Sequence, residues 1–273
     1  MSNTNQAAFT PAPAPVLAPV LSPALSARLA DAARLLREAK RIVCLTGSGA
    51  SAESGVATFR NVENGLWSRF DPQRLATQEG FAANPGLVWQ WYMHRLAAVE
   101  QAQPNGGHKA LAELERRTAD FVVVTQNVDD LHERGGSSRV LHLHGKLNRF
   151  HCNVCGFDHE LLPAERRATL PPRCFSCGGP VRPDVIWFGE PLPSRVLDKA
   201  WHASERCDLF LVVGTSGVVY PAAHLPLLAR QHGAAIIDIN PEATPISEQA
   251  DIHLAGRSGV LLPRLLELMA QEA

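Results

Sequence analysis

The 273-residue chain has little net charge, little lysine and no long apolar run. A formal net charge of −1 argues against non-specific binding to nucleic acid and gives no reason to expect contact with a membrane surface. No segment approaches the roughly 18 consecutive apolar residues of a transmembrane helix. With 45% hydrophobic and 19% charged residues, the composition is that of a soluble globular protein that can bury a substantial core.

The N-terminal segment lacks the features of a targeting peptide. It reads AAFTPAPAPVLAPVLSPAL, with no basic residue and no proline-free apolar stretch, which argues against a secretory signal and a mitochondrial transit peptide. Its alanine and proline content predicts a disordered or polyproline-like arm over residues 1–24. Because targeting signals are missing and the cysteines look reduced, we expect a cytoplasmic location.

What the chain does contain is an alternation of strand-like and helix-like segments. Four short, almost wholly apolar runs suit strands that are covered on both faces of a parallel sheet; they lie at 41–47, 120–127, 208–216 and 234–240. Helical patterns occur at 26–41, where Ser26 is the expected N-cap, and at 107–117, 222–232 and 260–271. This order predicts an α/β fold with a Rossmann-like doubly wound parallel sheet.

Small and polar residues follow each predicted strand. The strands finish in TGSG (46–49), TQN (125–127), GTS (214–216) and DIN (238–240). Because the carboxyl ends of parallel strands meet at one edge of a sheet, where open α/β sheets bind ligands, we expect a ligand site there.

Two other segments interrupt this pattern. Residues 62–106 are tryptophan-rich and predict a helical insertion, whereas residues 145–183 hold paired cysteines and predict a small metal-binding module. The Rossmann-like domain would then be assembled from 25–61, 107–144 and 184–273.

The cysteine spacing carries a specific signal. Cys152 and Cys155 form one C-x-x-C pair, and Cys174 and Cys177 form a second pair after 18 residues. This is the pattern of a four-thiolate zinc ribbon, in which a closed tetrahedron leaves no position for water. The sequence therefore predicts one structural Zn²⁺, and free buried cysteines or disulfides are the alternative.

Two further motifs are ambiguous when taken alone. The segment LTGSGASAESGVATFR (45–60) could approach a pyrophosphate, but Ala52 breaks the G-x-G-x-x-G pattern, so a tight structural turn is an equal alternative. Three histidines, His132, His142 and His144, are candidate general bases, and their chemistry alone does not distinguish them.

The ordered set of motifs resembles the sirtuins, NAD-dependent protein-lysine deacylases. The matching stretches are GSGASAESGVATFR, TQNVDDLH, HLHGKL, both cysteine pairs, VIWFGE (185–190), GTSGVVYPAA and DIN, which together span about residues 30 to 265. The chain departs from the family pattern at Ser48, where alanine is usual, and at Ala57, where proline is usual. Serine is small enough to keep the turn.

The resemblance implies NAD as co-substrate and a set of residues that bind it. Those residues are Gly47, Ser48, Gly49, Ala50, Glu53, Thr58, Phe59, Arg60, Trp67, Gln126, Asn127, Asp129, Gly214, Thr215, Ser216, Asn240 and Ser258. It also implies that acylated-lysine proteins bind as an added strand along Val185, Trp187, Phe188, Gly189 and Glu190.

The mechanism that the resemblance implies begins with attack of the acyl-lysine oxygen on C1′ of the nicotinamide ribose, and nicotinamide leaves. His144 then serves as general base toward the ribose hydroxyls, so that the 2′-oxygen attacks the O-alkylimidate carbon. Water finally releases free lysine and O-acyl-ADP-ribose.

One helix-like stretch, VWQWYMHRLAAV, places Tyr92 and Arg95 three residues apart, on one helix face. The sirtuin branch that removes succinyl and malonyl groups carries Tyr-x-x-Arg here, with a small residue in the pocket that Ala76 would match. An Arg fork and a Tyr hydroxyl suit a carboxylate. The alternative, without a carboxylate-binding pocket, is that Arg95 is solvated or paired with Glu100 or Asp71.

Three other functions compete with a desuccinylase and demalonylase that keeps some deacetylase activity. They are a strict deacetylase, a protein ADP-ribosyltransferase at the same NAD site, and a non-enzymatic zinc-ribbon binding module. The net charge and the lack of a basic cluster in 145–183 speak against a nucleic-acid module. The family resemblance suggests a monomer.

Overall fold

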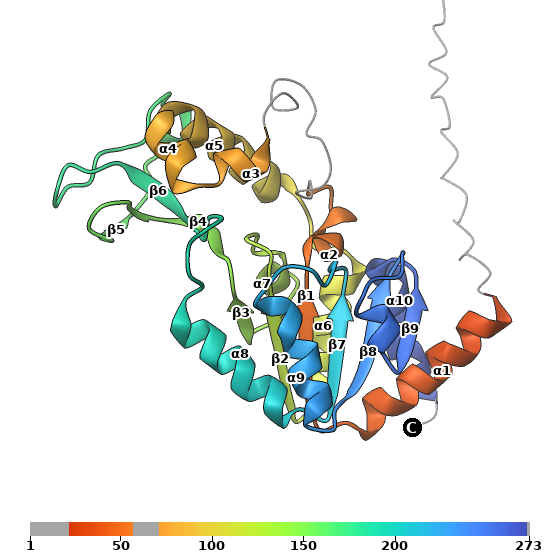
Figure 1. Ribbon diagram of the computed structural model, residues 1–273. Helices are drawn as coiled ribbons and strands as arrows, with labels where there is room; N and C mark the ends of the chain where they lie inside the picture. Colours follow the sequence, from red (N-terminus) through yellow and green to blue (C-terminus); the bar gives the residue numbers. More distant parts are fainter. Residues whose placement is uncertain (1–21, 57–70, 272–273) are drawn as a thin grey trace, which may run out of the picture.

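A six-stranded parallel sheet forms the larger part of the molecule in the computed structural model, which describes residues 22–56 and 71–271 (Figure 1). Its strands run in the order β3-β2-β1-β7-β8-β9. Their bounds are β1 (Arg41–Thr46), β2 (Asp120–Thr125), β3 (Val140–His142), β7 (Leu209–Val213), β8 (Ala235–Asn240) and β9 (Ile252–Ala255). The strand order reverses direction between β1 and β7, which is the topological switch point where such sheets bind ligands.

Helices cover both faces of this sheet because its four central strands, β2, β1, β7 and β8, are apolar on both sides. Ile42 and Cys44 point into one core, and Val43 and Leu45 point into the other. On the first face lie α1 (Pro23–Glu38), α6 (Gly106–Arg117) and α10 (Ser258–Gln271), and on the second lie α8 (Ser194–Arg206) and α9 (Leu225–Gln231). The predicted doubly wound fold is confirmed.

The helical insertion and the cysteine module lie together beyond the carboxyl ends of the strands (Figure 1). They contain α3 (Pro72–Leu75), α4 (Gln78–Ala83), α5 (Pro85–Gln101), and an antiparallel sheet of β4 (Gly145–Cys152), β5 (Asp158–His159) and β6 (Val181–Val185). One core joins the two segments, with Trp89 of α5 packed on Phe150 of β4 at 5.8 Å between ring centres. They therefore share one apolar interior.

The longest helix of this part, α5, is fixed at its start by local chemistry. Asn84 caps it by accepting the N–H of Leu87 at 3.0 Å, and Pro85 occupies the first turn, where no N–H is needed. Its buried residues surround most of its circumference, because the core of the insertion lies on one side and β4 and β6 lie on the other.

Three details differ from the sequence-based expectations. The first helix begins at Pro23 with Ser22 as its cap, four residues before the predicted Ser26. The short strands β3 and β9 were not predicted, and α2 (Ser48–Ala52) after the first strand has only five residues. Short elements also occur at α7 (Leu131–Arg134), η2 (Glu165–Arg167), η3 (Ala222–His224) and η4 (Ser247–Gln249). Of the helices described, none has both the length and the apolarity needed to cross a membrane.

Candidate functional site

Two glycine loops interlock at the carboxyl edge of the sheet, between β1 and β7. The N–H of Gly49 donates to the carbonyl of Gly214 at 2.8 Å, and Gly47 donates to Val213 at 3.1 Å. A Cβ on Gly49 would lie 2.7 Å from the Gly214 oxygen, and Gly214 itself has φ +59°. Only glycine fits at these contacts, so the loops bring bare backbone to the sheet edge.

Polar side chains from three strand ends converge on these loops. Gln126 donates to the Thr215 hydroxyl at 2.8 Å, and Asn240 donates to the Thr215 carbonyl at 2.8 Å. Asn127 donates to the carbonyl of Gly47 and to the hydroxyl of Ser51, both at 3.0 Å. The predicted edge site is thus one hydrogen-bonded network.

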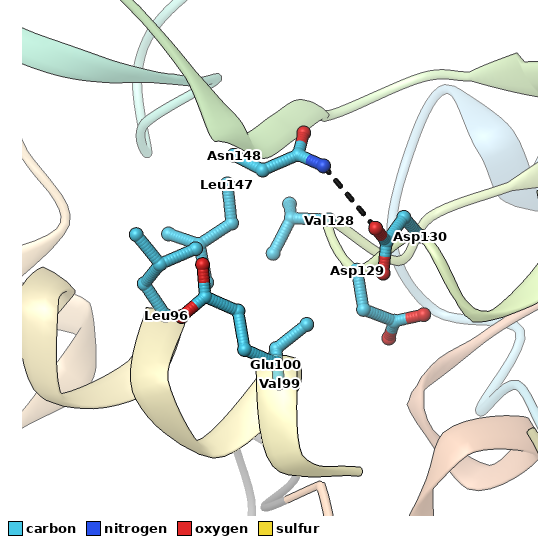
Figure 2. Close-up of a pocket in the computed structure, with 8 residues that line it drawn as sticks. All are labelled: Leu96, Val99, Glu100, Val128, Asp129, Asp130, Leu147 and Asn148. Atoms are coloured by element: carbon cyan, nitrogen blue, oxygen red, sulfur yellow. Dashed lines mark hydrogen bonds between the residues drawn. The ribbon is translucent and has the colours of Figure 1, made fainter. Parts of the chain in front are cut away.

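Residues at the end of α2, at the start of α10 and in the loop after β2 complete this edge. The Glu53 carboxylate accepts the N–H of Gly259 at 2.9 Å and the hydroxyl of Ser258 at 3.3 Å. Asp129 is buried, and that burial raises the pKa of its carboxyl above the ordinary value. A cavity of about 60 Å³, room for a few water molecules, separates the region of Asp129 and Asp130 from Leu96 and Leu147 (Figure 2).

The structure separates the three candidate histidines. His132 is fully buried and its Nε2 lies 2.9 Å from the Thr46 hydroxyl, while His142 is 2.9 Å from the Glu133 carboxylate. His144 is only partly buried, and its Nδ1 lies 2.9 Å from the carbonyl of Gln126. A carbonyl can only accept, so Nδ1 carries the proton and Nε2 has a free lone pair.

Burial also tunes His144 for proton abstraction. Desolvation lowers the pKa of the imidazole below its ordinary value, and the hydrogen bond to Gln126 opposes this only in part. The ring is therefore neutral at pH 7, with its basic nitrogen unoccupied by the Gln126 contact.

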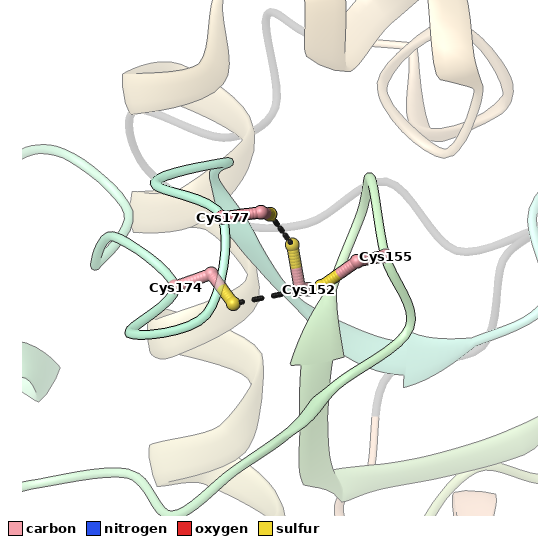
Figure 3. Close-up of side chains that lie close together, drawn as sticks. All are labelled: Cys152, Cys155, Cys174 and Cys177. Carbon is pink, nitrogen blue, oxygen red and sulfur yellow. Dashed lines mark hydrogen bonds between the residues drawn. The ribbon is translucent and has the colours of Figure 1, made fainter.

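The four paired cysteines form one cluster (Figure 3). All four Sγ atoms lie within 4.8 Å of one another, and a tetrahedral site with Zn–S bonds of about 2.3 Å needs S···S separations near 3.8 Å. Backbone N–H groups donate to three of the sulfurs at 3.4 Å, which stabilises thiolates. The residues after each pair, Gly156 and Gly178, have φ of +71° and +74°, as the tight knuckle turns require.

The helix α5 presents its Tyr and Arg to the interior. Tyr92 is 1% exposed and Arg95 is 9% exposed, so neither lies in solvent. The Arg95 guanidinium lies 5.1 Å from the ring centre of Trp91, and its charge acts on the Tyr92 hydroxyl. Ala76 is buried in the same core, and its carbonyl accepts the N–H of Phe188 at 2.9 Å.

The segment 185–190 is a strand end followed by a turn rather than one extended strand. β6 ends at Val185, and Gly189 has φ +87°. The N–H groups of 186, 187, 188 and 190 bond inside the protein. Among the described residues of this stretch, the Gly189 N–H alone lacks a partner, so fewer donors face outward than a free strand edge would offer.

Comparison with known proteins decides the family. The model of the Sir2 family matches residues 47–221. An "NAD-dependent protein deacylase 1" from Pseudomonas aeruginosa is 50% identical over 238 residues, covering 85% of this chain and 95% of that protein. The chain belongs to the Sir2 family.

Solved structures agree with this sirtuin assignment. A Sir2 homologue in complex with NAD superposes with a TM-score of 0.83 at 46% identity, covering 89% of this chain and 94% of that one. A second Sir2 protein, bound to a myristoylated histone peptide, gives 0.75 at 36% identity over 90% of this chain and 98% of that one. The sirtuin resemblance inferred from the motifs is confirmed.

Most of the residues predicted for the sirtuin site lie in one of two regions. Gly47, Gln126, Asn127, Asp129, Gly214, Thr215, Asn240 and Ser258 lie at the sheet edge, and Ala76, Tyr92, Arg95 and Trp187 lie in or beside the insertion core. Ser48 is exposed at the start of α2. Thr58, Phe59, Arg60 and Trp67, together with Ala57, fall outside the described residues.

Sequence reasoning missed several polar residues of this sirtuin. Ser51 accepts a hydrogen bond from Asn127. Arg182 and Gln78 donate to Glu190, and Asn153 accepts from both of these donors. The arginine of the strand segment VRPDV was the available signal for the second group, because a buried guanidinium needs a carboxylate nearby.

Proposed function

We propose that the chain is an NAD-dependent protein-lysine deacylase whose acyl pocket favours succinyl and malonyl groups, with some activity toward acetyl-lysine. Family membership and the names of its relatives support the reaction class. The buried pair of Tyr92 and Arg95 supports the acyl preference.

The chain's own groups fit NAD at the sheet edge. The interlocked loops at Gly47 and Gly214 would hold the pyrophosphate, Asn240 and Ser258 the adenosine, and Gln126, Asn127 and Asp129 the nicotinamide end. Bound NAD would supply the ribose carbon that reacts, and its ADP-ribose part would accept the acyl group. His144 would take a proton from a ribose hydroxyl through Nε2, since Nδ1 is held by the Gln126 carbonyl.

The metal has a separate role. Cys152, Cys155, Cys174 and Cys177 would hold one Zn²⁺ as a closed four-thiolate site that joins β4 to the start of β6, and it would take no part in the reaction.

Peptide substrates would lie along residues 185–190. Because most N–H groups there are already bonded, an added strand would use the Gly189 N–H and outward carbonyls. Related Sir2 proteins are bound to a p53 peptide in one structure and to a myristoylated histone peptide in another, which supports a peptide as the substrate. A monomeric state and a cytoplasmic location stay predictions.

The position of Arg95 supports the acyl preference. The side chain is buried on the same face as Tyr92, which speaks against a solvated arginine, and Glu100 accepts two hydrogen bonds from Arg166 at 2.7 and 2.9 Å. An acetyl group offers no charge to a buried guanidinium, whereas a succinyl or malonyl carboxylate offers two acceptor oxygens.

A paired assay tests this proposal. One peptide sequence carrying either succinyl-lysine or acetyl-lysine is turned over with NAD, and kcat/KM is compared. Charge-assisted bonds of about 1.5–3 kcal/mol each predict a succinyl preference of about ten- to a hundredfold. Arg95→Met should remove that preference, while Arg167→Met, at an exposed arginine of η2, should keep it.

Either of two results would contradict the proposal. Equal rates or an acetyl preference would make the protein a strict deacetylase, the closest competitor. Mass added to the peptide or protein substrate, instead of acyl lost from it, would indicate ADP-ribosyl transfer.

A further inference from the structure

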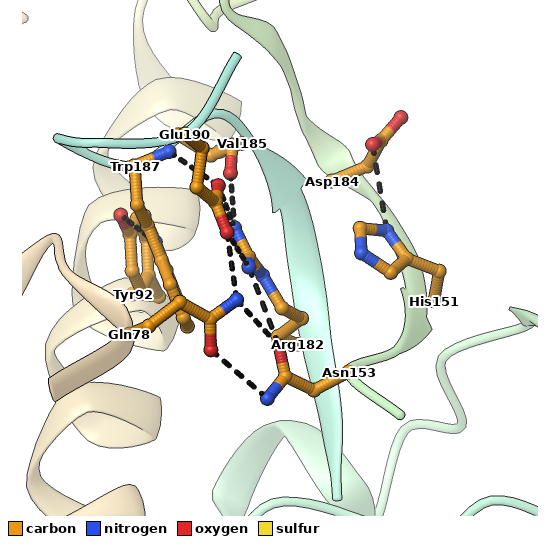
Figure 4. Close-up of polar contacts among 9 residues, drawn as sticks. All are labelled: Gln78, Tyr92, His151, Asn153, Arg182, Asp184, Val185, Trp187 and Glu190. Atoms are coloured by element: carbon orange, nitrogen blue, oxygen red, sulfur yellow. Dashed lines mark hydrogen bonds and ion pairs between the residues drawn. The ribbon is translucent and has the colours of Figure 1, made fainter. Parts of the chain in front are cut away.

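The Tyr92 hydroxyl has a defined neighbour in the 185–190 segment. The indole N–H of Trp187 donates to the Tyr92 oxygen at 2.8 Å (Figure 4). An indole nitrogen can only donate, so Tyr92 must accept this bond and keeps its own proton for another partner. Among the described residues, the Tyr92 hydroxyl makes no second hydrogen bond.

The indole cannot turn away, because its ring is enclosed. Trp187 is 2% exposed, and the Arg182 guanidinium carbon lies 3.2 Å from the centre of its ring. The ring of Phe81 lies 5.2 Å from Trp187, and the ring of Tyr92 lies 6.4 Å away and nearly parallel. Trp187 was predicted to bind substrate, but its side chain points inward, toward Tyr92.

The backbone of Trp187 is held by the same group of residues. Glu190 accepts the Trp187 N–H at 2.7 Å and two bonds from Arg182 at 2.6 and 2.9 Å, and Gln78 adds a fourth at 2.7 Å. Burial alone would raise the pKa of Glu190, but these donors outweigh it and hold the pKa below the ordinary value. The Arg182–Glu190 ion pair therefore stays charged and fixes the turn.

Two groups that can only donate lie beside Tyr92. The Trp187 indole and the Arg95 guanidinium have no acceptor atom, and the Tyr92 proton is the third donor. The positive charge of Arg95 acts on this hydroxyl, and burial keeps the phenol protonated by raising its pKa. The Glu190 carboxylate also acts on this hydroxyl, but its oxygens already accept bonds from Arg182, Gln78 and the Trp187 N–H. Donor groups gathered in this way suit a ligand that accepts, and an ionised carboxylate is such a ligand.

We propose that Trp187 determines acyl specificity as a positioning residue: its indole N–H occupies the acceptor side of Tyr92, so that the Tyr92 proton is donated to the acyl carboxylate beside Arg95. This inference rests on the proposed acid-recognising pocket. It adds a residue that contacts neither the acyl group nor the peptide through its side chain.

The test compares the ratio of succinyl to acetyl kcat/KM among variants of the full chain. The sharpest change replaces the Trp187 indole by a benzothiophene through site-specific incorporation of the amino acid, which keeps the bicyclic shape and removes the N–H. Trp187→Phe is the genetically simpler change. Losing one neutral hydrogen bond predicts a fall in the succinyl-to-acetyl ratio of about three- to tenfold. A change that affects both kcat/KM values equally leaves this ratio unaltered.

A double-mutant cycle and a packing control isolate the N–H. In the Tyr92→Phe background the benzothiophene replacement should no longer change the ratio, because the acceptor is gone. Phe81→Leu loosens the packing around the Trp187 ring while leaving its N–H, and should leave the ratio unchanged.

The outcomes separate the two proposals. If Tyr92→Phe and Arg95→Met lower the ratio but the benzothiophene does not, the pocket recognises acids and the role of Trp187 is wrong. If none of the three changes the ratio, the acid pocket is wrong and the role of Trp187 falls with it.

Discussion

The single hydrogen bond between His144 Nδ1 and the Gln126 carbonyl decides how the base works. It fixes the tautomer, so Nε2 is the only nitrogen that can accept a proton. His144→Ala should lower kcat/KM by about 10²- to 10⁴-fold with little change in thermal stability. Because burial depresses the pKa of His144, activity should persist as the pH falls through 6.5 and should decline only below it.

The pH profile of kcat/KM at saturating NAD measures this prediction. The folded base is neutral above its lowered pKa, so acid inactivates the enzyme only once His144 gains a proton. A steep loss between about pH 7.5 and 6.5 would mean that the base titrates like a solvent-exposed imidazole.

At the scale of residues, the sequence identified groups whose chemistry is unusual for their position. Tyr92 and Arg95 stood out in an apolar helix pattern, and the cysteine spacing defined the metal cluster. Arg182 did not stand out, and the role of the Trp187 side chain was not predicted. The Trp187–Tyr92 hydrogen bond joins the segment after β6 to α5 across 95 residues of the chain, and only the fold brings the two together. The chemistry of the histidines alone did not separate His144 from His132; the family resemblance selected His144, and its burial and hydrogen-bond partner fit that choice.

At the scale of elements, the four strands with continuous apolar runs were predicted, and the edge strands were not. β3 and β9 have three and four residues, and each contains a histidine and only partial burial. Edge strands need cover on fewer sides, so they lack the apolar run that identified β1 and β7. The interlocking of the two glycine loops also depends on the pairing of β1 with β7, which local sequence does not encode.

The zinc ribbon should support the acyl pocket although it lies outside the reaction. It closes the connection between β4 and β6, and β6 carries the Arg182 that packs on Trp187. Stripping the metal with a chelator should therefore lower the melting temperature and reduce deacylation at least about tenfold, and added Zn²⁺ should restore both. Elemental analysis should find one zinc per chain before stripping.

Matched cysteine variants sharpen that experiment. Cys155→Ser removes one thiolate of the cluster and should reproduce the stripped protein. Cys207→Ser changes a buried cysteine outside the cluster and should keep one zinc per chain. Full activity in a metal-free protein would show that the ribbon does not hold the pocket together.

On the scale of the whole molecule, a buried pair of histidines couples folding to pH. His108 and His132 meet at 4.9 Å between ring centres, under the loop after β1, and burial lowers their pKa values to about 4 and about 3. His108 Nε2 and His132 Nδ1 have no hydrogen-bond partner among the described residues. No group is therefore in place to stabilise either ring in its charged form.

Acid should therefore unfold the protein through these two rings. Below pH 6.5 these two histidines bind protons in the unfolded chain but not in the folded chain. The free energy of unfolding should therefore fall by up to about 2.7 kcal/mol per pH unit toward pH 4. Above pH 6.5 both states are neutral at these sites and the effect vanishes. Urea unfolding at a series of pH values measures the slope.

Replacing one ring should halve that slope. His108 accepts the N–H of Asn105 in a capping box at the start of α6, and glutamine can fill the same position without titrating. His108→Gln should therefore keep the helix cap and lose about half of the acid dependence, whereas His202→Gln, at an exposed histidine of α8, should keep all of it. An unchanged slope in His108→Gln would show that the His108 ring does not carry its share of the acid dependence, which contradicts the prediction.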